Sequence, residues 1–253
     1  PRRARAPRPP PLRPDGRVAS GNEIDVVDEQ DIEGLDLDSY AVIILANVDR
    51  LSPGAVRKLE AFVTAGGGVI FFAGDQLDVA SYNELLHRSG AGLLPYALGE
   101  AMDAPAGASI WIAEWDASHP VLRTFVEELA SVLRSVKVST YVKILDEDTA
   151  TPAPRIPPNG ESPDAASTQP SEVATRRVLV RLSDPDRSPL LVEQHFGRGL
   201  CLFVATSADL EWTDWASNFS YLPMMLELVQ YAARPAPAPA PAAAKAPPCA
   251  CYA

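Results

Sequence analysis

The strongest pattern of apolar and polar positions lies between Tyr40 and Asp75. Ala41 to Leu45 is an unbroken apolar run, typical of a parallel strand that is buried on both faces. Ser52-Pro53 suits the start of a helix, and four apolar residues then recur at helical spacing: Val56, Leu59, Phe62 and Val63. Three glycines separate this helix from a second buried strand, Val69 to Ala73. The stretch predicts a strand, a helix and a strand joined by a right-handed crossover.

Apolar patterns on both sides of this unit predict further elements. Upstream, residues 22–31 can form an edge strand or the strand that precedes the unit. Downstream, residues 78–89 have the spacing of a helix with Asp78 as its N-cap, and residues 93–99 are typical of a loop with one apolar turn. Further strands are expected at 109–115, 136–145, 177–182, 189–196 and 200–205, and a turn or helix at 121–133 and a closing helix at 219–232.

The order of these elements indicates the fold class. Parallel strand and helix units come first, and Gly197-Arg198-Gly199 later marks an antiparallel hairpin between two apolar strands. This order predicts an α/β fold, a three-layer sandwich around a mixed, mainly parallel sheet.

Three stretches have compositions that do not favour a packed core. Residues 1–17 are rich in Arg and Pro, about 146–171 is rich in Pro, Ser, Thr and Asp, and 235–253 is rich in Pro and Ala. We interpret them as a disordered basic arm, a disordered insertion and a disordered tail. One globular domain, residues 18–234, contains the insertion.

Charge and composition narrow the classes of function. The 253-residue chain has a net charge of −11, but the arm and tail hold seven of the 22 basic residues and one of the 33 acidic ones, so residues 18–234 carry −17. That sign argues against binding to nucleic acid phosphates. The arm either contacts nucleic acid or anionic lipid or is a simple Pro/Arg linker. No apolar run approaches the ~20 residues that span a bilayer, and the missing initiator Met and signal peptide suggest a fragment.

Short polar side chains follow several predicted strands, where ligands usually bind in open α/β sheets. The candidate ligand rim consists of Asn47, Asp75, Ser207 and Asp209. The alternative is that these residues cap helices and close turns, as Asn, Asp and Ser commonly do. No cofactor is predicted, and the three His residues lie on different elements without metal-ligand spacing, so no metal site is predicted.

A hydrolase or amidotransferase would need Ser or Cys as a nucleophile on a sharp turn from a strand to a helix. The matching turn, residues 73–76, contains neither. Cys201 and His195 could approach each other across the predicted hairpin, but a buried structural Cys is the simpler interpretation. No catalytic residue is therefore predicted. Trp212 and Trp215, in an acidic loop, either form a partner surface or plug the end of the sheet.

Three segments together resemble a known family: YAVIILANVDRLSPGAVRKLEAFVTAGGGVIFFAGD, ASHPVLRTF and GRGLCLFVATSADLEWTDW. They resemble the class I glutamine amidotransferase-like domain of bacterial BatA-type membrane proteins, which also carry a von Willebrand factor A domain. The resemblance covers about residues 18–234 and implies a flavodoxin-like fold. True class I glutamine amidotransferases carry a Cys in the elbow and a later His-Glu pair, whereas this chain has Asp75 near the elbow and no matching His-x-Glu.

The resemblance implies a scaffold that has lost its chemistry. Our hypothesis is a non-catalytic interaction or ligand-sensing domain of a cell-envelope protein, whose partners are other domains of the same or neighbouring envelope proteins. Membrane association is implied only through segments that this chain does not include. The alternative hypothesis is a hydrolase that uses the acidic rim, with Asp75 and Asp209 as base or metal ligands.

Overall fold

The computed structural model describes residues 24–105, 108–146 and 176–234. The strands are β1 (Val42–Ala46), β2 (Gly68–Phe72), β3 (Ala97–Asp103), β4 (Ile110–Trp115), β5 (Lys137–Val138), β6 (Thr140–Leu145), β7 (Arg176–Leu182), β8 (Pro189–Phe196) and β9 (Gly199–Val204). The α-helices are α1 (Pro53–Thr64), α2 (Val79–Tyr82), α3 (Glu128–Arg134) and α4 (Tyr221–Ala232). The expected basic arm, the Pro/Ala tail and all but Asp146 of the expected insertion lie outside the described residues.

The chain has a mixed α/β fold whose larger sheet has seven strands in the order β1-β2-β9-β8-β7-β4-β5. The pairs β1–β2 and β2–β9 are parallel, whereas the pairings from β9 through to β5 are antiparallel. The expected mixed sheet is confirmed, but the expectation that it is mainly parallel is wrong. The reason is that β7, β8 and β9 follow one another through short turns, which only antiparallel neighbours allow. Strands β3 and β6 form a separate antiparallel pair.

The predicted strand, helix and strand unit is confirmed. The Ser52 side chain accepts a hydrogen bond from the Ala55 amide at 3.0 Å, and Pro53 begins α1. The Asp78 side chain caps α2, which continues into a π-helical turn, Asn83–His87. The hairpin between β8 and β9 and the closing helix α4 are also confirmed.

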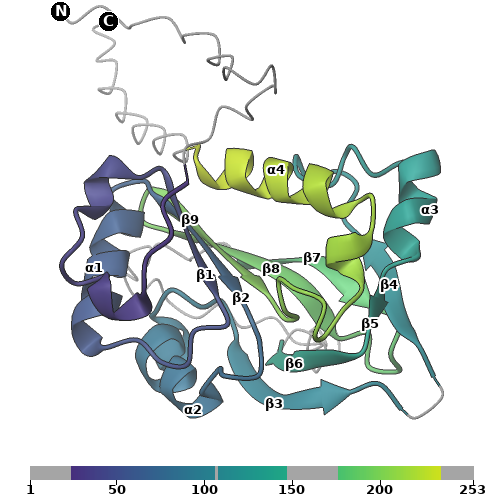
Figure 1. The fold of residues 1–253 in the computed structure, drawn as a ribbon, viewed down its shortest axis with the longest axis horizontal. Coiled ribbons are helices and arrows are strands. Elements are labelled where there is room, and N and C mark those ends of the chain that lie inside the picture. The colour runs from purple at the N-terminus through teal and green to yellow at the C-terminus, as the bar shows by residue number, and fades with distance from the viewer. Residues whose placement is uncertain (1–23, 106–107, 147–175, 235–253) are drawn as a thin grey trace, which may run out of the picture.

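Helices pack on both faces of β2 and β9 (Figure 1). The ring of Phe71 packs against Tyr82 of α2, while a Cβ on Gly68 would meet the backbone of Ala232 in α4. Since neighbouring strand residues point to opposite faces, α2 and α4 lie on opposite sides of the sheet. One continuous apolar core joins these elements.

The apolar sequence of β1 predicted a strand buried on both faces, and this prediction is wrong. Strand β1 is the edge of the seven-stranded sheet, and Ile44 is 44% exposed. Residues 24–28 form no strand, and residues 29–31 form a 3₁₀ turn, so the strand expected within 22–31 is absent from the described part of that segment. An apolar run shows that a strand forms but does not show which neighbours it has.

Two other expectations need correction. The loop expected at 93–99 leads into β3, and the strand expected at 136–145 is divided between β5 and β6, which belong to different sheets. Residues 121–133, expected as a turn or a helix, contain both: turns occupy residues 117–124, and α3 begins at Glu128. None of the described helices is long and apolar enough to cross a membrane.

Candidate functional site

The predicted rim residues Asn47 and Asp75 lie together beyond β1 and β2. The Asn47 Nδ2 donates to Asp75 Oδ1 at 2.8 Å, and the Gln76 amide donates to Asn47 Oδ1 at 2.9 Å. Asn47 has a φ of 53°, a left-handed conformation that Asn tolerates better than most residues. Gly74 permits this contact, because a Cβ there would lie 2.1 Å from Asn47 Oδ1. The sequence N-V after one strand and G-D-Q after the next therefore builds one joined turn.

Hydrogen bonds from Asn47, and then from Gln76, hold the pKa of Asp75 below its ordinary value of 3.8. A lowered pKa in the folded state stabilises the fold above the ordinary pKa, and this contribution is lost as the pH falls through the folded-state pKa. The carboxylate therefore stays ionised and holds the two turns together at neutral pH.

Replacing Asn47 with glycine is expected to raise the pKa of Asp75 toward 3.8, since the larger of the two side-chain hydrogen bonds is lost. Glycine also accepts the left-handed backbone, so the change does not add strain. A carboxyl ¹³C NMR titration of the variant measures this. Gln76→Ala is the matched control and should give a smaller rise; an unchanged pKa in the Asn47 variant would show that its hydrogen bond has no role in solution.

Ser207 and Asp209 lie beyond β9 and complete the rim. Hydrogen bonds from the Glu211 amide and from Ser207 lower the pKa of Asp209, while the charge of Asp75 acts on it in the opposite direction. The Ser207 Oγ also accepts from the Trp212 amide at 3.2 Å. The structure thus brings the four predicted rim residues to one end of the sheet, and gives each of them a hydrogen bond that closes a local turn.

The rim presents two ionised carboxylates, those of Asp75 and Asp209, to solvent. A cavity of about 590 Å³ lies nearby, beyond β1, and its lining includes Asp49, Arg50 and Ser52 but none of the four. Within residues 24–105, 108–146 and 176–234, no group of three or more His, Cys, Asp or Glu side chains is arranged to hold a metal ion. Ligand binding at the rim remains a prediction.

Cys201 is buried in β9, and burial raises the pKa of its thiol far above the ordinary value, with a further contribution from Glu60 of α1. In the β8–β9 register, Cys201 lies opposite Gln194, and His195 lies opposite Leu200. Neighbouring strand residues point to opposite faces, so Cys201 and His195 are on different sides of the sheet. The approach of these two residues across the hairpin, considered from the sequence, does not occur.

A buried His–Glu pair is present that the sequence analysis missed. His119 Nε2 lies 3.1 Å from Glu193 Oε2, and both side chains are at least 96% buried. The Val121 amide donates to His119 Nδ1, so Nε2 carries the proton and donates to the carboxylate. The ring of Tyr231 packs edge-on against His119 at 4.7 Å. The available signal was an acidic residue inside the apolar strand PLLVEQHF.

This pair cannot activate Cys201. Glu193 and its partner Tyr231 lie on the α4 face of the sheet, whereas Cys201 faces α1. The pair instead connects the turn at His119-Pro120 with β8 and α4, three parts of the chain far apart in sequence.

Both Trp residues pack against the apolar core. Trp215 is 2% exposed, and its Nε1 donates to Ser220 Oγ at 3.1 Å. Trp212 is partly buried against the core. Whether this loop binds a partner stays a prediction.

Solved structures with similar folds include the cytoplasmic protein STM3548 from Salmonella typhimurium, at 15% identity and a TM-score of 0.57 over 84% of this chain and 82% of that chain. The cytoplasmic protein STM1381 from Salmonella typhimurium LT2 is similar, at 13% identity and 0.57 over 83% and 81%. A ThuA-like protein from Parabacteroides merdae ATCC 43184 has 18% identity and a TM-score of 0.45 over 80% and 74%. At these identities, the likeness to the two Salmonella proteins shows a shared fold alone.

No family model matches the sequence, and no curated protein matches it.

Proposed function

We propose that this chain is a non-catalytic domain on a three-layer, flavodoxin-like scaffold of the class I glutamine amidotransferase-like kind. In this proposal it serves as an interaction or ligand-sensing module of a bacterial cell-envelope protein and contacts other envelope domains. The strand, helix and strand unit and the packing of α2 and α4 on opposite faces support the scaffold. The resemblance of the three sequence segments supports the envelope setting.

One observation carries the non-catalytic part of the proposal. In the turn after β2, where an amidotransferase would present its nucleophile, Asp75 uses its two carboxylate oxygens to accept from Asn47 and Gln76. Its φ is not in the left-handed region, so the strained elbow that exposes a nucleophile is missing at this position. Cys201 is buried, and neither His195 nor His119 lies on its face of the sheet.

The hydrolase alternative finds less support in the rim. General acid catalysis by a carboxyl group needs a raised pKa, so that the group keeps its proton near neutral pH. The pKa values of both Asp75 and Asp209 are lowered by hydrogen bonds. The pair therefore lacks a general acid, while both carboxylate oxygens of Asp75, which a base or metal-ligand role would use, already accept hydrogen bonds from Asn47 and Gln76.

The non-catalytic proposal is tested by a glutaminase assay on the wild-type chain and on Cys201→Ala. We expect no ammonia release from glutamine above the buffer rate for either protein, because the thiol is buried and its raised pKa keeps it protonated at neutral pH. Cys201→Ser is the matched control for side-chain size. Activity in the wild type that disappears in Cys201→Ala would overturn the proposal.

A further inference from the structure

The outer edge of β1 has no strand paired to it in the described structure. Among the described residues, β1 pairs only with β2. The Ala41 carbonyl and the Asn47 amide both bond to β2, so the peptide groups of the odd-numbered residues face β2. The amides and carbonyls of Val42, Ile44 and Ala46 consequently point outward. These alternate residues leave hydrogen-bond donors and acceptors along the edge with which one more strand can pair.

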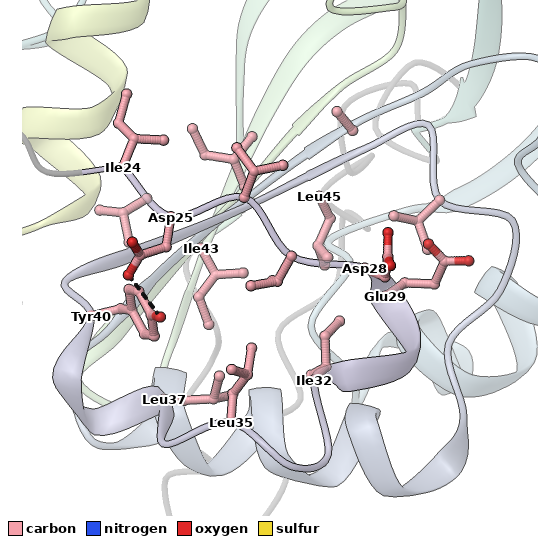
Figure 2. A pocket seen from close by; sticks show the side chains of 16 residues that line it. Ile24, Asp25, Asp28, Glu29, Ile32, Leu35, Leu37, Tyr40, Ile43 and Leu45 are labelled. Carbon is pink, nitrogen blue, oxygen red and sulfur yellow. Dashed lines mark hydrogen bonds between the residues drawn. The ribbon is translucent and has the colours of Figure 1, made fainter.

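The extended segment Ile24–Asp28 lies across from this edge without closing it. No backbone hydrogen bond joins it to β1 in the described structure, and one side-chain bond, from Tyr40 Oη to Asp25 Oδ2 at 3.1 Å, joins it to the base of the strand. A cavity of about 380 Å³ separates the two (Figure 2). Its lining is mostly apolar and includes Ile32, Leu37, Ile43 and Leu45.

Both sides of this gap expose apolar side chains that a closed edge would cover. Ile24 is 80% exposed, Val26 94% and Ile44 44%. Proteins normally protect a free edge with Lys, Pro or a bulge, and β1, with the sequence VIILA, has none of these. The wall behind the gap is held in place, because Lys58 of α1 donates to the carbonyls of Glu33 and Leu35.

The acidic residues around the gap indicate which kind of segment can bind there. Residues 25–38 contain seven acidic residues and no Lys or Arg. A second copy of this chain, pairing through its own β1, would bring two such acidic segments together, which like-charge repulsion opposes. An apolar strand with basic flanks satisfies the outward peptide groups, covers the apolar walls and neutralises the acidic border.

We propose that the edge of β1 binds an extended apolar segment of a partner protein, flanked by Lys or Arg, which adds as an eighth strand to the sheet. This inference rests on the proposed function as an interaction module and specifies where and what it binds. The sheet extension requires no change in the core, because the outward groups of β1 have no other partner among the described residues.

The experiment uses the full chain and a fluorescent peptide, Lys-Lys-Val-Thr-Val-Ile-Val-Lys-Lys. We expect saturable binding by fluorescence anisotropy that weakens as salt is added, since exposed charges are screened. Amide exchange measured by NMR should slow at Val42, Ile44 and Ala46. A peptide with Glu in place of the four Lys should bind at least about tenfold more weakly. Equal binding of the two peptides would overturn the assigned partner chemistry.

The variant Ile44→Pro removes one outward amide and leaves the β1–β2 ladder intact, since Pro is tolerated where the N–H faces away from the sheet. It should bind the basic peptide about tenfold more weakly, the effect of one lost backbone hydrogen bond. The matched control Ile44→Thr keeps the amide and should bind within about twofold of wild type. Wild-type affinity in Ile44→Pro would overturn the proposal.

Two further measurements keep the test decisive. If Ile44→Pro does not fold, a peptide N-methylated at alternate residues replaces it, and undiminished binding of that peptide would overturn strand addition. Light scattering reports the oligomeric state, and a wild-type dimer that Ile44→Pro converts to a monomer would assign the edge to a second copy instead. Failure of peptide binding without any glutaminase activity would overturn this inference and leave the non-catalytic assignment standing.

Discussion

Replacing Glu193 with alanine is expected to lower the free energy of unfolding by about 3–5 kcal/mol. The change removes the acceptor for His119 Nε2 in a site where both side chains are at least 96% buried. His119 would then keep an unpaired donor in the core, and the lost side chain would leave a cavity. Urea unfolding, followed by circular dichroism, measures the difference.

Two controls separate the buried pair from the general cost of changing a strand residue. Glu193→Gln keeps an acceptor oxygen and nearly the same volume, so it should cost clearly less than alanine. Glu114→Ala removes an exposed carboxylate in β4 that pairs with Arg187 at 3.3 Å, and should change stability by about 1 kcal/mol or less. Equal effects of the two alanine changes would show that the His119–Glu193 contact adds no stability.

The same cluster predicts a pH dependence in alkaline solution. Burial, with further contributions from the charge of Glu193 and a hydrogen bond to it, raises the pKa of Tyr231 to about 12. The unfolded-state pKa is about 10. A raised pKa stabilises the fold fully below the unfolded value, and this contribution is lost as the pH rises from about 10 to about 12. In Glu193→Gln, the phenol should ionise at lower pH, which ultraviolet absorbance detects.

The elements that local chemistry determines could be predicted from the sequence. Ser52 and Asp78 accept from the first amides of their helices because short oxygen-bearing side chains do so at helix starts. The glycines around Arg198 gave the β8–β9 hairpin. These features depend on a few neighbouring residues, so a local pattern is sufficient to place them.

Partners distant in sequence could not be predicted in this way. His119 and Glu193 are 74 residues apart, and neither carries a motif that identifies the other. The apolar run of β1 predicted a strand but not its place at the edge, because an edge strand without protective residues can have the same apolar pattern as a central strand. The rim residues lie together because the carboxyl ends of parallel strands meet at one edge of the sheet, as the topology predicts. Their hydrogen bonds close local turns, so these bonds alone do not show that the residues bind a ligand.

Replacing Gly199 with alanine is expected to lower the free energy of unfolding by about 1–3 kcal/mol or more. Gly199 begins β9 where the chain passes directly under the end of α1. A Cβ at this position would lie 2.2 Å from the Gly67 carbonyl oxygen and 2.3 Å from that of Val63. Both atoms belong to the backbone, so a rotamer change cannot relieve the contact.

The expected cost also follows from what those two carbonyls do. The Val63 carbonyl accepts from the Gly66 amide at 2.9 Å, and the Gly67 carbonyl accepts from the Leu200 amide at 3.3 Å. Moving them away from a new methyl group would weaken the end of α1 and its connection to β9 together. Gly99→Ala in β3 is the matched control: its nearest contacts would be 3.4 Å, and stability should stay within about 0.5 kcal/mol of wild type. Equal urea midpoints for Gly199→Ala and Gly99→Ala would show that α1 can move away from the sheet without loss, and that the close helix–strand contact does not determine the stability of this unit.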